Sequence, residues 1–455
     1  MSSQQRLVII VSILASFVAF LDSSVVNVAL PAISRDLGGG LVIQQWVVDS
    51  YLITLGALIL LAGSLSDLFG RRRILMFGLA GFGVTSILCA IAPDATFLVI
   101  ARALQGVAGA LLVPSSLAII ISTFSGKEQG RAIGIWTAWT GIAFIVGPLL
   151  GGILVDDFSW RLIFGINILP IAVCLWLLSL LKLAEHKRSV RIDTLGAILC
   201  AIGLSVTVFG LIEQPRYGWH NPTILTTVVV GLLMLFSFVY YEKRKEDAML
   251  PLSLFRIRNF RVGNIATTAI YGALSIATFL IVIFLQQVGG YSAFDAGLSL
   301  LPVTIIMFLL SPRFGALSGR YGPRFFMGCG PIIAGVGFLL MLHISTHVNY
   351  STELLPGILI FGIGLSMTVA PLTSAVLGDI EKQSSGIASA VNNAISRLAG
   401  LIAIALVGLI VGRRLDLGGF HRAILYTALL IMVGGVISAA GIRNHTQVTI
   451  SNAKN

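Results

Sequence analysis

Residues 45–73 read QWVVDSYLITLGALILLAGSLSDLFGRRR, and this stretch contains the pattern that decides the fold. Its first part, 45–64, is an apolar segment of about the 20 residues that an α-helix needs to cross a bilayer. Gly63 and Gly70 then flank a short segment that is followed by three consecutive arginines. Two glycines permit a tight turn, and clustered arginine is typical of cytoplasmic loops beside a membrane. The stretch therefore predicts a spanning helix that ends in a cytoplasmic turn.

The whole chain shares this apolar character. Of its 455 residues, 56% are hydrophobic and only 11% are charged, and the mean hydropathy is +0.97. A soluble protein carries about 25% charged residues, so most of this surface cannot face water. Fourteen segments of spanning length leave no room for a separate catalytic domain, which excludes a soluble enzyme. These segments are 7–30, 45–64, 74–92, 96–121, 132–155, 162–182, 194–212, 223–241, 262–287, 296–312, 327–346, 354–377, 387–411 and 421–441.

The lysines and arginines set the orientation of these spans. An even number of spans places both termini on one side of the membrane. With the termini inside, the inner segments hold 22 of the 30 basic residues and the outer segments hold six. This is the positive-inside bias of membrane proteins. We predict a multi-pass protein of the cell (inner, cytoplasmic) membrane with both termini in the cytoplasm. The net charge of +11 is explained by basic residues beside the lipid bilayer, so we expect no nucleic acid as a partner.

An internal repeat divides the chain. The segment GSLSDLFGRRR at 63–73 recurs in part as GALSGRYGPR at 315–324, an offset of 252 residues. Internal repeats of this kind are typical of secondary transporters that are built from two similar helical halves. We predict six-helix halves at 1–182 and 259–455, with two inserted spans and a cytoplasmic linker at 183–258.

Further motifs accompany the glycine–aspartate–arginine loop. They are LDSSVVNVALP at 21–31, Gln45-Trp46 with Tyr51, RALQGVAGA at 102–110 and GIAFIVGPLLGG at 141–152. In this order the motifs resemble the major facilitator superfamily, in its drug:proton antiporter branch with fourteen spans. The resemblance covers nearly the whole chain. The second-half loop departs from the pattern at Gly319, where an acid would complete the motif.

This resemblance implies a fold and a function. The fold would be an all-α major facilitator bundle of two six-helix halves plus two extra central helices. The function would be proton-coupled export of small amphipathic drugs or toxic compounds by alternating access, without enzymatic activity. It also implies no cofactor, since a proton gradient would supply the energy, and we expect a monomer and no metal site. The alternatives are a dedicated exporter of one metabolite, antibiotic or lipid, and a non-transporting membrane sensor.

Three ionisable residues within the spans are candidates for proton coupling. An ionised side chain at the centre of a spanning helix costs about 2.5–3.5 kcal/mol on insertion scales, so Asp22, Asp49 and Arg102 each require an explanation. Asp22 and Arg102 lie at similar predicted depth, so they could pair directly or through water, as a proton site or as a static ion pair. Asp49 lies near the outer end of its span, where a proton-coupling role and a merely interfacial position are equally compatible with the pattern.

Two motifs are candidate gates. The first is the inner-gate motif of Gly63, Asp67, Gly70, Arg71, Arg72 and Arg73. It is either a charged contact that breaks during transport or only a topology signal. The second is the antiporter motif of Gly141, Gly147, Pro148, Gly151 and Gly152. Its proline removes a backbone hydrogen bond beside a smooth face, which predicts a hinge and a sealing surface between the halves, with a static kink as the alternative.

A third set of residues is the candidate substrate cavity. Its members are Asn27, Trp136, Trp139, Asn392, Asn393 and Arg397. Aromatic residues at such spacings often serve helix packing instead. In the branch that this chain resembles, members that transport divalent organic cations tend to carry acidic residues in the thirteenth span. In this chain the thirteenth span carries Arg397 and no acidic residue. We therefore expect monovalent lipophilic cations, zwitterions or neutral compounds as substrates.

Overall fold

The computed structural model describes residues 2–181, 193–245, 248–381 and 384–444, and in these ranges every regular element is helical. The α-helices are α1 (Ser3–Leu37), α2 (Gly40–Phe69), α3 (Arg71–Ala90), α4 (Ala95–Thr123), α5 (Gly126–Gly141), α6 (Ala143–Asp157), α7 (Leu162–Gly165), α8 (Ile168–Leu180), α9 (Thr194–Tyr217), α10 (Pro222–Arg244), α11 (Arg258–Gln287), α12 (Ala293–Ser299), α13 (Leu301–Tyr321), α14 (Pro323–Leu340), α15 (Leu355–Gly378), α16 (Ser385–Val411) and α17 (Leu417–Gly441). Short turns of helix are η1 (Leu252–Arg256), η2 (Met341–His343) and η3 (Tyr350–Leu354).

These helices supply fourteen segments that are long and apolar enough to cross a membrane. Each of the fourteen coincides with one predicted span, which confirms the all-α membrane fold. Three spans are interrupted, because α5 and α6, α7 and α8, and α12 and α13 each share one span. The sequence predicts a bend at Gly147-Pro148. In the structure this span is instead interrupted at Ile142, and α6 continues as a helix through Pro148.

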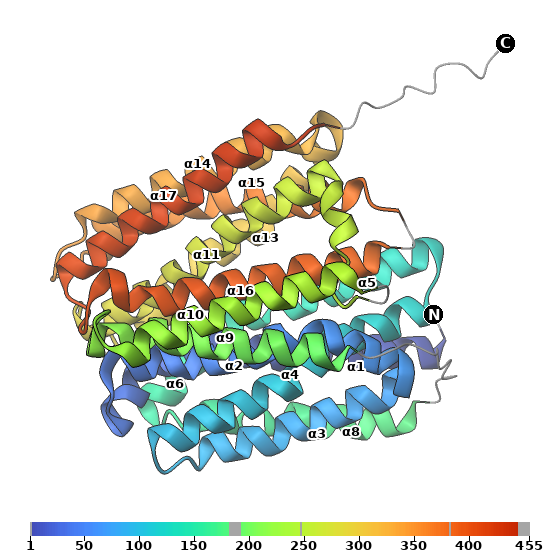
Figure 1. The fold of residues 1–455 in the computed structure, drawn as a ribbon, viewed down its shortest axis with the longest axis horizontal. Helices are drawn as coiled ribbons and strands as arrows, with labels where there is room; N and C mark the ends of the chain where they lie inside the picture. The colour runs from blue at the N-terminus through green and yellow to red at the C-terminus, as the bar shows by residue number, and fades with distance from the viewer. Residues whose placement is uncertain (1, 182–192, 246–247, 382–383, 445–455) are drawn as a thin grey trace.

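The spans form two groups that lie side by side (Figure 1). Helices α1 to α8, drawn in blue to green, pack mainly on one another, and α11 to α17, drawn in yellow to red, form the second group. The inserted helix α9 contacts both α2 and α16 and therefore touches both groups, whereas α10 packs against α9. The beginning of α1 and the end of α17 lie at the same end of the bundle. This end, which carries most of the basic residues, is called the inner side below.

The repeat has the same backbone geometry in both halves. Gly70 joins α2 to α3 with φ 99°, and Gly322 joins α13 to α14 with φ 87°. Such positive φ values favour glycine, because a Cβ would clash with the backbone. Arg72 and Arg324 are also 252 residues apart, and each donates from Nε to a carbonyl near the end of a helix, Leu178 at 3.1 Å and Ala439 at 2.7 Å. The repeat is therefore structural as well as sequential.

Candidate functional site

Asp22 and Arg102 meet in the interior of the first helical group. Asp22 lies in α1 and Arg102 in α4, and Arg102 Nη1 donates to Asp22 Oδ2 at 2.6 Å. Their side chains are 0% and 2% exposed, so both are removed from solvent. A buried ion pair is stable only when further hydrogen bonds satisfy the remaining atoms of both partners. The rest of the site supplies these bonds.

The second carboxylate oxygen of Asp22 accepts two amide hydrogen bonds. Gln105 Nε2 in α4 donates to Oδ1 at 3.1 Å, and Asn167 Nδ2 at the start of α8 donates to the same atom at 2.9 Å. Both amides also donate to Ser86 Oγ in α3, at 3.0 and 3.4 Å. Three spans therefore meet at one carboxylate, and α3 supplies a shared acceptor for both amides. Three donors, one of them cationic, therefore satisfy both oxygens of the Asp22 carboxylate.

Arg102 is surrounded as closely as Asp22. Its Nε donates to the carbonyl of Val47 in α2 at 3.1 Å, and its Nη1 also donates to Gln105 Oε1 at 2.7 Å. The guanidinium carbon lies 4.4 Å from the ring centroid of Tyr51 and 5.7 Å from that of Phe164. Aromatic faces stabilise a cation in a desolvated position. Arg102 therefore stays charged and remains in place as a fixed counterion for Asp22.

Asp49 has the opposite surroundings. Its side chain is 0% exposed, and neither carboxylate oxygen has a hydrogen-bond partner among the described residues. On the same face of α2, one turn earlier, Gln45 donates from Nε2 to the carbonyl of Ile404 in α16 at 2.7 Å. The face of α2 that bears Asp49 therefore meets the second helical group. The structure does not show the alternative of an interfacial acid that reaches water, because the Asp49 side chain is fully buried.

The inner-gate motif is only partly described. The side chain of Asp67 lies outside the described residues, so its role as a gate acid stays a prediction. Gly63 and Gly70 lie at the end of α2, where Gly70 makes the turn described above. Arg71 Nη1 donates to the Ala118 carbonyl at 2.8 Å, and Arg73 also has an interaction. Arg72 donates to the end of α8 in its own half, so at least this arginine stabilises a helix end.

The antiporter motif faces two different neighbours. A Cβ added to Gly147 would overlap Ser24, and one added to Gly151 would lie 2.5 Å from Val25, so both glycines pack against α1 of their own half. Gly152 faces the second half, where its Cβ would lie 2.8 Å from the backbone nitrogen of Phe294, and Pro148 lies beside Gly297 of the second half. A Cβ on Gly141 would meet nothing within 4 Å. The expectation that the whole motif seals the halves is therefore corrected, because Gly147 and Gly151 lie on the opposite side of α6.

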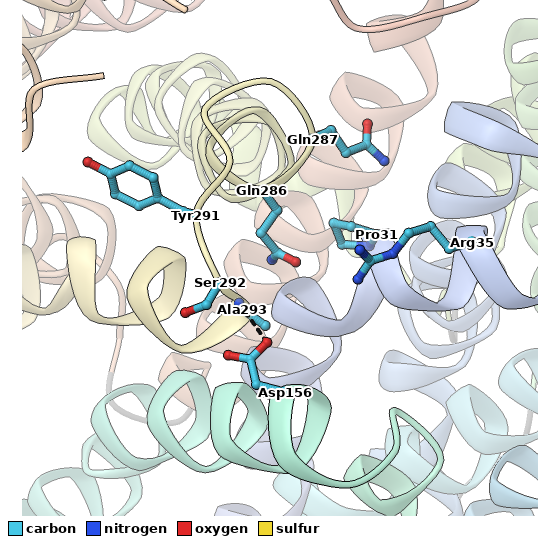
Figure 2. Close-up of a pocket in the computed structure, with 8 residues that line it drawn as sticks. All are labelled: Pro31, Arg35, Asp156, Gln286, Gln287, Tyr291, Ser292 and Ala293. Carbon is cyan, nitrogen blue, oxygen red and sulfur yellow. Dashed lines mark hydrogen bonds between the residues drawn. The ribbon is translucent and has the colours of Figure 1, made fainter. Parts of the chain in front are cut away.

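The outer ends of the two halves are joined by a seam that the sequence did not indicate (Figure 2). Asp156 at the end of α6 accepts hydrogen bonds from the backbone nitrogens of Ala293 and Phe294 at 3.0 and 2.8 Å. Gln286 in α11 donates to the Val28 carbonyl at 2.9 Å. Next to these bonds lies a pocket of about 300 Å³, which is also lined by Arg35.

The glycine contacts of the outer seam are tight. A Cβ on Gly297 of α12 would lie 2.7 Å from the Pro148 carbonyl oxygen in α6. The two halves are therefore in close contact at this seam in the structure.

The candidate substrate residues are not brought into one cluster. Trp136 donates to the Ser12 carbonyl at 3.2 Å and to Ser16 Oγ at 3.1 Å, so it is held by its own half. Asn392 donates to Asn264 and Thr267 at 2.9 and 3.0 Å. Trp139 is 57% exposed, and Asn27 and Asn393 are half-buried.

Arg397 differs from the other candidates. It is half-buried in the middle of α16 and has no hydrogen bond or ion pair with the part of the chain that the structure describes. A Cβ on Gly56 of α2 would lie 4.0 Å from its Cβ, and its charge acts on Tyr51 of α2 and Tyr271 of α11. Arg397 therefore lies where the two halves meet.

Sequence reasoning missed two members of the Asp22 site and the outer seam. Asn167 and Ser86 lie in apolar spans, and their polar character was the only sequence feature that could have marked them as members of the site. A buried amide or hydroxyl needs a hydrogen-bond partner, so each predicts some polar contact but not which one. Nothing in the local sequence of Asp156 indicates its partner 137 residues away.

Comparison with known proteins is consistent with this geometry. The family model of the Major Facilitator Superfamily matches residues 12–404. The chain is 36% identical over 422 residues to the multidrug resistance protein Stp of Mycobacterium tuberculosis, a match that covers 90% of this chain and 76% of that protein. It is 34% identical over 411 residues to the puromycin resistance protein pur8 of Streptomyces alboniger, covering 88% and 80%. The solved structure of a D-xylose-proton symporter superposes with a TM-score of 0.70 at 14% identity, covering 97% of this chain and 99% of the other, which shows the fold alone.

Proposed function

Since this chain belongs to the Major Facilitator Superfamily and is a multi-pass protein of the cell membrane, we propose that it is a proton-coupled antiporter that exports small amphipathic compounds. Export is supported by the relatives that are named for multidrug resistance and for puromycin resistance. Proton coupling is supported by the buried carboxylate of Asp22, and this is the single observation on which the proposal depends. The chain would work without a cofactor and as a monomer.

The geometry supports a simple order of steps. We take the arrangement in the structure, in which the halves meet at the outer seam, as the inward-facing state of this cycle. In the proposal, Asp22 pairs with Arg102 in this state after its proton has left toward the inside. Substrate then enters from the inner side, and the halves rock about the membrane centre until the outer seam opens. In the outward-facing conformation Asp22 takes a proton from outside, substrate leaves, and the neutral site returns. One proton moves inward for each outward step of the substrate.

Transport in energised membrane vesicles tests this function. We expect export of a fluorescent amphipathic dye when a proton gradient is imposed, and its arrest when a protonophore collapses the gradient. Export that continues at full rate without the gradient would contradict proton coupling. Absence of dye export, with a normally inserted protein, would favour the dedicated exporter of a single compound.

Asp49 would act as a second proton-dependent element. An unpaired carboxylate buried between α2 and α16 costs several kcal/mol, so Asp49 is neutral while the outer side is closed. When the halves separate on the outer side, water reaches this face of α2 and the group can ionise. Closure of the outer side would then require that Asp49 takes up a proton from outside.

Asp49→Asn should therefore weaken the dependence of outer opening on external pH and leave only the part that Asp22 contributes. A cysteine at Ala293, which is 2% exposed in the outer seam, reports this opening through reaction with a membrane-impermeant maleimide. Labelling is divided at each pH by that of the same cysteine in the unfolded protein, because the reacting thiolate also increases with pH. With native Asp49 this ratio should rise with external pH, and in Asp49→Asn it should rise less steeply. An unchanged pH dependence in the variant would show that Asp49 has no part in closure.

Arg397 would bind the acceptor group of the substrate. An unpaired cation at the meeting point of α2, α11 and α16 favours a compound that carries a carboxylate or another strong acceptor, as a zwitterion does. Rhodamine 110 and its methyl ester, rhodamine 123, differ in this one group and form a matched pair of probes.

Arg397→Gln should lower export of rhodamine 110 by about tenfold relative to rhodamine 123, the effect of losing one hydrogen bond to a charged group. Arg397→Lys keeps the charge and should retain part of the preference. Dye export from vesicles measures both ratios. If Arg397→Gln lowers the export of both dyes equally, Arg397 supports the fold and does not select the substrate.

A further inference from the structure

The sixth span is interrupted beside the Asp22 site. Helix α7 ends at Gly165 and α8 begins at Ile168, so Asn167 lies in the break between them. Asn167 occupies the N-cap position of α8, where an asparagine side chain usually accepts a hydrogen bond from its own helix. Here it makes no such bond. Its amide instead donates across to Asp22 in α1, at 2.9 Å.

The two amides that bond Asp22 Oδ1 differ in how they are held. Gln105 lies in α4, one turn from Arg102, and accepts a hydrogen bond from that guanidinium. It therefore moves together with the counterion. Asn167 supplies the hydrogen bond that the sixth span makes to Asp22. Its own side-chain oxygen Oδ1 has no hydrogen-bond partner among the described residues. No other bond of this side chain beyond those to Asp22 and Ser86 fixes it in the break.

The outer part of the sixth span is tied to the same helix as Asp22. Trp160 Nε1 and Arg161 Nη1 both donate to Asp36 Oδ2 in the last turn of α1, at 2.9 and 2.6 Å. The break at Asn167 thus separates an outer segment that is fixed to α1 from α8, which packs on α3 and α1. A change in the angle between the two segments would move Asn167 relative to Asp22.

We propose that Asn167 is a positioning residue of the proton site, which makes the proton affinity of Asp22 depend on the arrangement of the interrupted sixth span. With Asn167 in contact, Asp22 stays ionised; with Asn167 withdrawn, Asp22 has lost one of its three donors and takes up a proton more readily. This inference deepens the proposed proton coupling and rests on it for its role in transport.

The test measures protonation of Asp22 directly in purified protein. A buried protonated carboxyl has an infrared C=O band, and the band that is missing from Asp22→Asn belongs to Asp22. Asn167→Leu keeps the approximate volume but removes the donor. We expect its Asp22 band to titrate about one pH unit higher than in the wild type, the tenfold change in proton affinity that corresponds to one hydrogen bond to a charged group. Asn167→Ser retains a hydroxyl donor and should give a smaller shift.

A matched control is Asn264→Leu. Asn264 is a buried asparagine of α11 in the second helical group, where it bonds Asn392 and the Phe260 carbonyl and makes no bond to the Asp22 site. It should leave the Asp22 titration unchanged. The proposal is overturned if Asn167→Leu and Asn167→Ser titrate like the wild type, or if Asn264→Leu shifts the band equally. Because the infrared titration needs no transport, vesicles that export without a proton gradient would refute the proposed function while this result still stood.

Discussion

Asp22→Asn should insert and bind substrate but reduce gradient-driven export to the level of empty vesicles. Asparagine has the size of aspartate and can still accept a hydrogen bond from Arg102, but it cannot take up or release a proton. The counterion keeps its bonds to Val47 and Gln105, which limits the cost of removing the buried negative charge. The measurement is dye export against a concentration gradient, with substrate binding and the amount of inserted protein determined in parallel.

Asp94→Asn is the matched control for this prediction. It makes the same substitution at the exposed N-cap of α4, the helix that carries Arg102. Export should remain close to that of the wild type, because asparagine caps a helix about as well as aspartate does. Asp22→Glu should keep some export with an altered pH profile. If Asp22→Asn still exports against a gradient with unchanged pH dependence, Asp22 is structural and Asp49 becomes the main candidate.

The second large effect is expected at Gly152. A leucine side chain there cannot fit beside the backbone of Phe294, so the outer seam cannot close as it does in the structure. Overpacking at this contact destabilises the closed seam by about 1–3 kcal/mol. A cost near the upper end, about 2.8 kcal/mol, would lower the ratio of inward-facing to outward-facing protein about a hundredfold. Gly152→Leu should therefore nearly abolish export and raise maleimide labelling of a cysteine at Ala293.

Substitutions at three other glycines of the motif distinguish an effect on closure of the outer seam from an effect on thermal stability. Gly141→Leu has free space and should leave export and labelling nearly unchanged. Gly147→Leu and Gly151→Leu should lower the thermal stability of the first half, because both face α1, without raising labelling at Ala293. If Gly152→Leu labels no faster than Gly141→Leu, the contact between α6 and α12 is not part of the outer gate.

The same residues show how far sequence reasoning reached at the proton site. Asp22 and Arg102 were singled out because a charge in an apolar span is costly, and their similar depth along two helices made a contact possible. Depth does not specify rotation about a helix axis. For Asp49 the sequence left an interfacial acid as one alternative, whereas the structure turns it toward α16 and away from water.

Local sequence patterns specified the number of spans, the repeat at an offset of 252 residues and the family motifs, and they predict the orientation of the spans. These are local properties, because the length of an apolar run, the side on which arginines accumulate and a glycine turn each depend on neighbouring residues only. The tertiary structure alone decided that Asn167 bonds Asp22, that Gly152 faces the second half while Gly151 does not, and that Asp156 joins α6 to α12. Each of these depends on which helix faces meet across more than a hundred residues of chain. Packing of whole spans against one another selects those faces, and no local pattern encodes them.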